Sequence, residues 1–263
     1  MYDLASRRTG GADPSVALDP PPPAFLLSDA PRAAAEAGAT LAAWAWLRTA
    51  AARGDGHPVL VLPGFLAGDE FTAVCRAFLR QQGFDPYAWG AGVNWGRWEA
   101  LDLVIERAEA LAERAQRKIS VVGASMGGLY ARALALARPD LVRCVVTLGS
   151  AVLPPQRSNH VWPVYEAVTR QPEHTMHVPA PLPVPSTSIY SRVDGLSDWR
   201  PCVQPRGDRQ ENVGILSSHH GMMSHPAALF LLADRLSQDD AGWKPFDPPA
   251  YLGSLFELEP GAS

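Results

Sequence analysis

The sequence predicts an α/β fold with a mostly parallel central sheet, flanked by helices and carrying a short proline-rich cap. Short apolar runs alternate with segments of helical spacing between residues 58 and 149. The segments between successive apolar runs are long enough for the crossover connections that parallel strands need. A Gly-x-Ser-x-Gly sequence at residues 123–127 joins one apolar run to one helical segment.

Composition narrows the class of protein and of partner. The chain has 263 residues, 47% of them hydrophobic, and a formal net charge of -4. This length supports one large α/β domain or two small ones, and the acidic balance without a basic block argues against a nucleic-acid partner. No apolar run approaches the roughly 18 to 20 residues that span a bilayer, and the first 23 residues lack the order of a secretory signal. We therefore expect a cytoplasmic protein without a transmembrane segment.

The N-terminal part is expected to be peripheral. Residues 1–30 contain the proline run Pro20 to Pro23 and predict a mobile arm. An alanine-rich segment with apolar residues at helical spacing predicts a helix over about residues 31–53 that packs on the domain. Residues 31–263 are then expected to form a single domain, with a cap insertion at about 151–185.

The first strands and helices follow from apolar spacing. The apolar run 57–65 ends at Pro-Gly and predicts a strand buried on both faces. Residues 70–82 predict a helix that Gly83 ends, 84–89 a strand, 90–96 a glycine-rich loop and 99–117 a long amphipathic helix.

The next segment contains the first candidate catalytic residue, Ser125. A β-branched strand over residues 118–124 turns at Ser125 into a helix that stops before Pro139. A serine on such a sharp turn needs flanking positions with almost no side chain, and Gly123 and Gly127 meet that need. The context of strand, turn and helix is typical of a nucleophile elbow.

The remaining elements continue the alternation. Strands are predicted at 141–149, 187–191 and 211–216, the last being the final strand, and a helix at about 226–236. Between them, about 151–185 carries eight prolines from Pro154 to Pro185, and we interpret this stretch as a cap or lid. The tail, residues 243–256, is expected to lie against the domain.

A serine nucleophile requires a base and an acid that orients the base. Ser125, Asp194 and His219 occur in that order, each just after a predicted strand and therefore at the same edge of the sheet. Asp198 is an alternative acid, and His220 is an alternative base. For the developing oxyanion, the N–H of Met126 and the N–H of Phe65, in the loop after an early strand, are the expected donors.

Five stretches of the chain resemble bacterial α/β-hydrolases of the esterase and lipase group. They are LVLPGFLAGD, GFDPYAWGAGVNWG, GASMGG, YSRVDGLSDW and SSHHGMMSHPA. The resemblance covers about residues 58–246 and implies an open, largely parallel sheet with Ser125, Asp194 and His219 as nucleophile, acid and base. Such relatives often carry a cysteine after the base histidine that can pair with one matching Cys202. Because His220 occupies that position here, Cys202 is expected to be an unpaired thiol.

The pocket is expected to be apolar. Trp89, Trp95, Trp162 and Leu66 are predicted to line an acyl or aromatic pocket, although each tryptophan has a place in the core as its alternative. A metal site from His174, His177, His219, His220 and His225 is disfavoured, because these histidines have no carboxylate or cysteine at ligand spacing. We expect no metal and no cofactor.

These predictions together indicate a serine carboxylesterase or lipase that acts on a small-molecule or lipid ester. Thioesterases, polyester depolymerases and acyltransferases use the same three residues and remain alternatives. A binding module that keeps the fold without turnover is a further alternative.

Overall fold

The computed structural model describes residues 19–153, 158–170, 181–239 and 242–258, over which strands and helices alternate. The strands are β1 (Pro58–Leu62), β2 (Asp85–Ala88), β3 (Ile119–Ala124), β4 (Val142–Leu148), β5 (Ser186–Tyr190), β6 (Gln210–Ile215) and β7 (Phe256–Leu258). The α-helices are α1 (Pro23–Ala50), α2 (Ala73–Gln81), α3 (Ala100–Ala115), α4 (Met126–Ala137), α5 (Trp162–Thr169) and α6 (Pro226–Ser237).

The strands form one sheet in the order β2-β1-β3-β4-β5-β6-β7. Strands β1 to β6 are parallel, and only β7 runs antiparallel, against β6. The mostly parallel sheet flanked by helices confirms the predicted fold class. Because β1, β3, β5 and β6 end at the same edge, the loops that follow them are brought together there.

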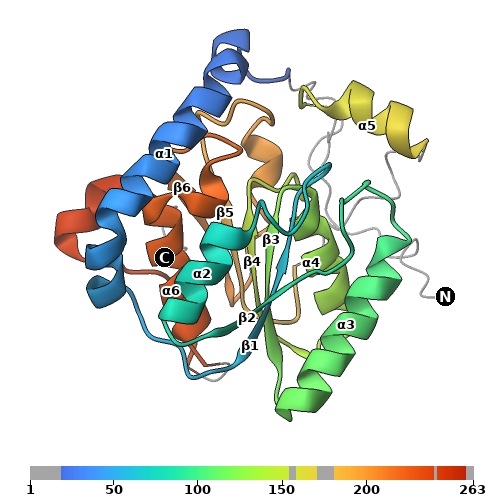
Figure 1. Cartoon of the computed structure of the whole chain (residues 1–263), viewed down its shortest axis with the longest axis vertical. Helices are drawn as coiled ribbons and strands as arrows, with labels where there is room; N and C mark the ends of the chain where they lie inside the picture. The colour runs from blue at the N-terminus through green and yellow to red at the C-terminus, as the bar shows by residue number, and fades with distance from the viewer. Residues whose placement is uncertain (1–18, 154–157, 171–180, 240–241, 259–263) are drawn as a thin grey trace.

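Two helical layers cover the sheet. Helices α1, α2 and α6 lie on one side, and α3 and α4 on the other (Figure 1). Strand β1 serves both layers: Val59 and Val61 belong to one apolar cluster, and Leu60 and Leu62 belong to the other. Fully burying such a side chain stabilises the fold by roughly 1.5–3 kcal/mol. The continuous apolar run of β1 is therefore explained by burial on both faces.

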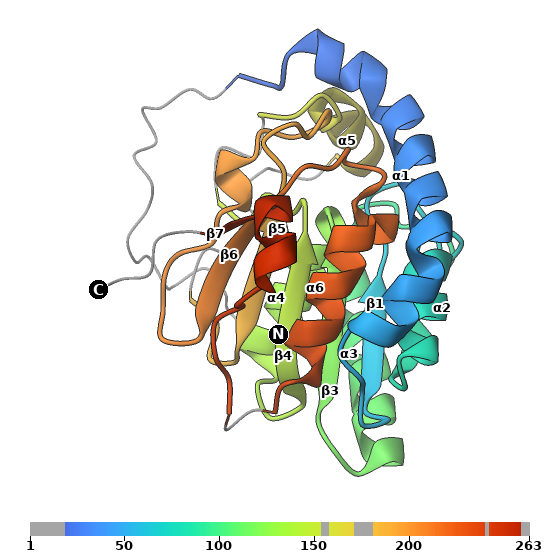
Figure 2. The ribbon, with the colours of Figure 1, turned by 90° about the vertical axis from the view of Figure 1, so that its left-hand side faces the viewer.

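Helix α1 corrects the prediction for the N-terminal part. It begins at Pro23 rather than at about residue 31, so residues 23–30 of the expected arm are helical, and residues 1–18 lie outside the described part. A proline has no N–H to lose in the first turn, which suits Pro23, while Pro31 lies inside the helix. Tertiary contacts hold these first turns, since Arg32 donates to the carbonyl of Val193. Figure 2 shows α1 running along α6.

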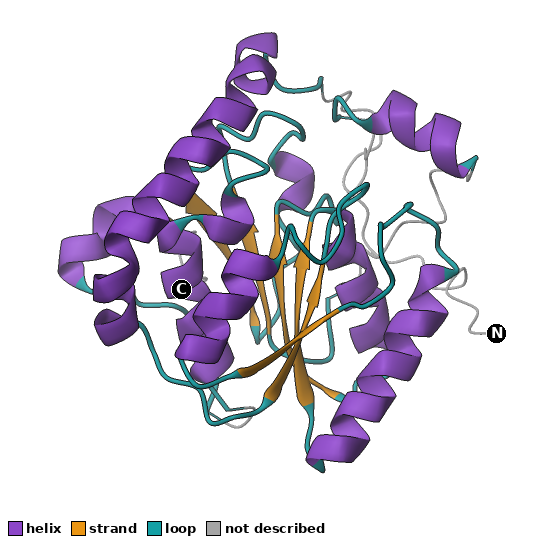
Figure 3. Ribbon diagram, viewed as in Figure 1, coloured by secondary structure: helices purple, strands orange, loops and turns teal. Residues whose placement is uncertain are grey.

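The cap and the tail contain elements that the prediction did not include. Helix α5 lies within the proline-rich segment and, in Figures 1 and 3, at the same end of the molecule as the start of α1. Strand β7 shows that the strand at 211–216 is not the last one. Its three residues are too short to give an alternating pattern. Phe246, Leu252 and Phe256 of the tail are buried, as expected for a segment that lies against the domain.

Two further expectations concerned the state of the cysteines and the absence of a transmembrane segment. Cys75, Cys144 and Cys202 are buried, and none of the three forms a disulfide, so Cys202 is a thiol as expected. Within the described ranges, no helix has the length and apolar character needed to cross a membrane.

Candidate active site

Ser125 lies at the turn between β3 and α4. Its backbone has a φ of 49° and a ψ of -120°, a conformation that a residue with a side chain adopts only when its surroundings enforce it. A Cβ on Gly123 would lie 2.4 Å from the carbonyl carbon of Gly127, and one on Gly127 would lie 2.5 Å from the carbonyl oxygen of Leu62. Only glycine fits either position, as predicted for this motif.

Asp194 follows β5 and is only 3% exposed. Its Oδ1 accepts the backbone N–H groups of Leu196, at 2.8 Å, and Ser197, at 2.9 Å. Its Oδ2 lies 2.6 Å from Nδ1 of His219. Each carboxylate oxygen therefore has a fixed partner, and the carboxylate is held facing the histidine.

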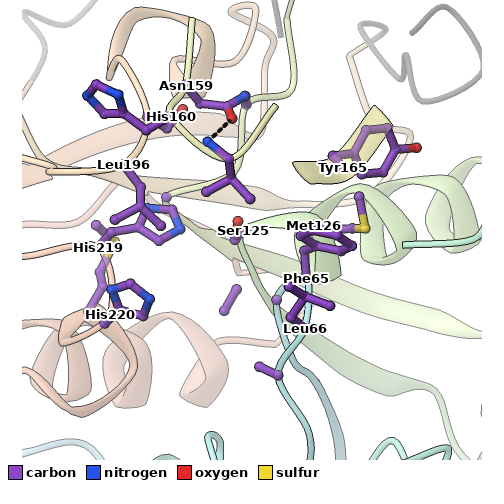
Figure 4. Close-up of a pocket in the computed structure, with 18 of the residues that line it drawn as sticks. Phe65, Leu66, Ser125, Met126, Asn159, His160, Tyr165, Leu196, His219 and His220 are labelled. Carbon is purple, nitrogen blue, oxygen red and sulfur yellow. Dashed lines mark hydrogen bonds between the residues drawn. The ribbon is translucent and has the colours of Figure 1, made fainter. Parts of the chain in front are cut away.

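His219 follows β6 and lies across the cavity from Phe65 and Leu66 (Figure 4). With Nδ1–H donating to Asp194, Nε2 remains available as a proton acceptor. The end of β4 leaves room for the ring, because a Cβ on Gly149 would lie 3.3 Å from ring atoms of His219. Among the described residues, no hydrogen bond joins Ser125 Oγ to this ring. Such bonds are often long before substrate binds.

Two carboxylates act on the protonation of His219. Burial lowers the pKa of His219, but the charge and hydrogen bond of Asp194 and the charge of Asp29 raise it more. The pKa of His219 therefore lies above its usual value of 6.5. The surroundings of His219 favour the imidazolium form that general-base catalysis would create.

The alternative acid and base have other partners. Asp198 pairs with Arg200 at 2.9 Å and does not bond to either histidine. His220 donates from Nδ1 to Asp29 of α1 at 2.6 Å. Of the two adjacent histidines, His219 is the one paired with Asp194.

The backbone N–H groups of Phe65 and Met126 were predicted as the donors to a developing oxyanion. Within the described part of the chain, the N–H groups of Phe65 and Met126 have no acceptor. The loop after β1 passes directly beside the nucleophile, since a Cβ on Gly64 would lie 3.2 Å from Cβ of Ser125. Met126 begins α4, where the helix dipole favours negative charge. The predicted donors are therefore available and close to Ser125.

Asn94 holds the loop that carries Phe65. Its side-chain Nδ2 donates to the carbonyl of Pro63 at 2.9 Å. Its backbone donates to the carbonyl of Ala67 at 2.9 Å and accepts from Leu66 at 2.7 Å. Leu66 itself has a φ of 60°, so these bonds hold a strained turn.

Comparisons with known proteins agree with this arrangement. The family model for the alpha/beta hydrolase fold matches residues 100–170, which include β3, the Ser125 turn and α4. The chain has the α/β-hydrolase fold.

Several solved structures of α/β-hydrolase enzymes are similar to this chain in fold. Aspergillus fumigatus lipase B has a TM-score of 0.53 at 18% identity, over 72% of this chain and 55% of that one. Bacillus licheniformis lipase in its mature form has a TM-score of 0.52 at 10% identity, over 71% of this chain and 94% of that one. Polyneuridine aldehyde esterase has a TM-score of 0.50 at 12% identity, over 70% of this chain and 100% of that one. At these identities the similarity establishes the fold, and the predicted resemblance is confirmed at that level.

In this α/β-hydrolase fold, a cavity of about 780 Å³ opens beside Ser125 and His219. Its size lies in the range of small-molecule sites. Among the residues predicted to line a pocket, Leu66 and Trp162 do so. Helix α1 also contributes, through Leu26.

Two of the predicted pocket tryptophans do not line this cavity. Trp89 is 3% exposed in the apolar cluster under α3 and α4, where its Nε1–H donates to the carbonyl of Gly92. Trp95 is 54% exposed and lies outside the cavity lining. The prediction for both was wrong, because an aromatic residue in a glycine-rich loop can turn toward the core or toward solvent.

The sequence analysis missed Asp29 and Asn94. Asp29 accepts the backbone N–H of His219 at 2.8 Å, although it precedes that residue by 190 positions. Neither residue had a local signal, because each acts through contacts that only the fold creates. The glycines around Asn94 were a partial indication of a constrained loop.

The five histidines considered for a metal site do not come together in the described part. His219 and His220 are each paired with an aspartate, and His225 accepts from the backbone N–H of Ala227. No group of three potential ligands occurs among the described residues, and His174 and His177 lie outside them.

Proposed function

We propose that the protein is a serine carboxylesterase or lipase that hydrolyses carboxylic esters through an acyl-enzyme on Ser125. One observation carries the proposal. The strained Ser125, the base His219 and the two residues with acceptor-free N–H groups, Phe65 and Met126, border one cavity, and Asp194 pairs with His219 behind it. Nucleophile, base, orienting acid and oxyanion donors are the parts that acyl transfer requires.

Acylation begins when Ser125 Oγ attacks the ester carbonyl carbon. The serine proton passes to Nε2 of His219, and the Asp194 carboxylate stabilises the imidazolium that results. The carbonyl oxygen becomes an oxyanion that accepts from the N–H groups of Phe65 and Met126. Each such donor typically contributes about 10²- to 10³-fold to kcat.

The same groups complete the turnover. His219 gives its proton to the departing alkoxide, and the alcohol leaves behind an ester on Ser125. Water then attacks the acyl carbon while His219 takes its proton. Collapse of the second tetrahedral intermediate returns the proton to Ser125 Oγ and releases the carboxylic acid.

The cavity supports an apolar acyl group as the substrate portion bound beside Ser125. Leu26, Phe71, Leu129 and Met222 are among its walls, and Trp162 borders it from α5. Desolvating such a chain contributes about 0.8 kcal/mol for each buried methylene group. A small-molecule or lipid ester fits this environment, while thioesters and polyesters share the reacting carbonyl.

A panel of substrates tests the proposal. We expect hydrolysis of nitrophenyl esters from acetate to palmitate, and Ser125→Ala should lower kcat by about 10⁴- to 10⁶-fold. Acyl thioesters, a triglyceride emulsion and a polyester film assayed in parallel identify the preferred carbonyl. A well-folded protein without turnover on any of these substrates would contradict the proposal and leave a binding protein with this fold.

A further inference from the structure

The N-terminal helix α1 contacts both loops that carry the candidate acid and base. The carboxylate of Asp29, which is 1% exposed, accepts from four groups. Its Oδ2 accepts the backbone N–H groups of Gly195, at 3.1 Å, and His219, at 2.8 Å. Its Oδ1 accepts the backbone N–H of His220, at 3.2 Å, and the Nδ1–H of the same residue, at 2.6 Å. One side chain therefore joins the loop after β5 to the loop after β6.

The two loops are shaped to let α1 approach. A Cβ on Gly195 would lie 2.5 Å from the carbonyl oxygen of Phe25 and 2.7 Å from Oδ2 of Asp29. A Cβ on Gly221 would lie 1.8 Å from Oε2 of Glu36. A side chain at residue 195 would collide with the backbone of α1, and one at residue 221 would displace the Glu36 carboxylate, so both glycines permit the close approach.

We propose that Asp29 is a positioning residue for the ester hydrolysis proposed above. Its carboxylate fixes the backbone of His219 and supplies a second negative charge beside the imidazolium that forms when His219 accepts the serine proton. The proposal rests on the proposed function for its kinetic consequences only. The pairing of Asp29 with the base loop is independent of any substrate.

Asp29 remains charged at neutral pH. Burial raises the pKa of Asp29, but hydrogen bonds from His220 and His219, together with the charge of His219, lower the pKa far below its usual value. Arg32 partly offsets this charge, since its Nη2 lies 3.7 Å from Oδ2 of Asp29. The negative charge of Asp29 raises the pKa of His219, although by less than Asp194 does.

The other titratable groups near His219 act from different sides. Asp194 faces its Nδ1 from the loop after β5, and His220 adjoins it on its own loop. Glu36, two turns along α1 from Asp29, accepts from the hydroxyls of Ser217 and Ser218 and from the backbone N–H of Ser218. Across the cavity the described titratable side chains are Glu70, His160 and Tyr165.

Glu36 provides a matched control for Asp29. Both carboxylates lie on α1 and bond to the loop after β6, but only Asp29 bonds to residue 219. Asp29→Asn and Glu36→Gln each remove one negative charge with little change in size. If Asp29 acts on His219 through its charge and position, only the first substitution should change the titration of His219.

The first measurement is an NMR pH titration of the His219 ring in the full-length protein, which needs no substrate. Asp29→Asn should move the titration midpoint to lower pH, because the imidazolium loses a neighbouring negative charge. Glu36→Gln should leave the midpoint close to that of the wild type. Equal midpoints in all three proteins would overturn the proposal, whether or not the protein hydrolyses esters.

The second measurement follows kcat/KM against pH on a nitrophenyl ester. In the wild type, activity should rise with pH as His219 loses its proton, and Asp29→Asn should move this rise to lower pH. We expect the plateau to fall about 10- to 100-fold because the base is less well placed. A fall in the plateau with an unmoved midpoint would reduce Asp29 to a structural role. No wild-type turnover would instead contradict the proposed function.

A second variant, expected to move the His219 midpoint in the opposite direction, keeps the proposal testable if Asp29→Asn does not fold. Arg32→Gln removes the cation beside Asp29 and leaves the carboxylate in place. The His219 midpoint should then move to higher pH, since the negative charge is no longer offset. A midpoint that stays fixed or moves downward in folded Arg32→Gln would count against the proposal even if Asp29→Asn cannot be purified.

Discussion

Two Ser-His-Asp chains occur in this fold, at opposite ends of β3. At the far end from Ser125, His57 Nδ1 lies 2.6 Å from Asp55 Oδ1, and His57 Nε2 lies 2.9 Å from Ser120 Oγ. The bonds of this second chain are as short as those of a catalytic triad. Ser120 is hydrogen-bonded to its histidine, whereas no such bond joins Ser125 to His219 in the described part of the chain, so hydrogen bonding alone would favour Ser120 as the nucleophile.

Their surroundings do distinguish them. Ser120 and His57 have no exposed surface, and Ser120 lies within strand β3. Ser125 has a positive φ at the end of that strand and borders the cavity. An ester carbonyl can reach a serine only where the backbone turns it out of the sheet, which is the contribution of Gly123 and Gly127.

Alanine substitution of each serine separates these roles. Ser120→Ala should retain the esterase activity of the wild type and lower the free energy of unfolding by about 1–3 kcal/mol, because His57 loses a buried partner. Ser125→Ala should abolish activity and leave unfolding nearly unchanged. Chemical denaturation and nitrophenyl ester assays on both variants check this. Loss of activity in folded Ser120→Ala would contradict it.

The second chain also predicts how stability depends on pH. Burial lowers the pKa of His57 below its usual 6.5 in the folded state, and the Asp55 hydrogen bond only partly offsets this. Below pH 6.5 the unfolded chain then binds more protons at this residue than the folded one, so the contribution of neutral His57 to stability is lost as pH falls.

Denaturation of the wild type and His57→Gln at several pH values measures this contribution. His57→Gln should be the less stable protein above pH 6.5, and the gap in unfolding free energy should narrow as pH falls below that value. A gap that stays constant down to pH 5 would show that His57 does not resist protonation.

Among the elements, α1 differs most from its prediction. Its inner face carries Asp29, Glu36 and Thr40, and Thr40 donates to the carbonyl of Ser224. The apolar residues Leu27 and Leu41 are exposed. Apolar spacing finds helices that pack through apolar stripes. The helix itself was predictable from its alanines, but its docking face and true start were not, because both depend on polar contacts with distant loops.

Two glycine substitutions test the docking of α1. Gly195→Ala should lower both kcat/KM and the free energy of unfolding, the latter by about 1–3 kcal/mol, because its Cβ would collide with the backbone of Phe25. Gly38→Ala is the control on α1 itself, with nothing within 4 Å of its Cβ. It should stabilise the protein by about 0.5–1 kcal/mol without changing kcat/KM. Full activity in Gly195→Ala would mean that the site tolerates a displaced helix.

At the scale of the whole molecule, the sheet brings together what the chain keeps apart. Chain order and strand ends were enough to predict that Ser125, Asp194 and His219 meet at one edge. Long apolar runs and a glycine motif are local signals, so β1 to β6 were predictable as well. The pocket was not, because its walls come from α1, α5 and the loops after β1, β4 and β6. The direction of each tryptophan depends on these neighbours.

Substitution of Trp162, which lines the cavity, and of Trp95, which does not, tests which tryptophan affects acyl binding. Trp162→Ala should change the preferred acyl length of nitrophenyl esters, because it removes a cavity wall. Trp95→Ala should leave the acyl-length profile unchanged, because that side chain is exposed outside the cavity. Both profiles are normalised to the acetate ester to remove effects on overall rate. An unchanged profile in Trp162→Ala would place acyl binding elsewhere.

The contact between α1 and residue 219 spans 190 positions of sequence, and this has a consequence for biosynthesis. Helix α1 leaves the ribosome before its partner loops, which follow about 10 to 40 seconds later at the usual rates of translation. An alanine-rich helix of 28 residues can form locally in that interval, but Asp29 and Glu36 have none of their partners from the two loops until then. A nascent chain that stops before residue 219 therefore has the Ser125 turn without the base loop, so the hydrolysis proposed above requires that synthesis has passed this loop.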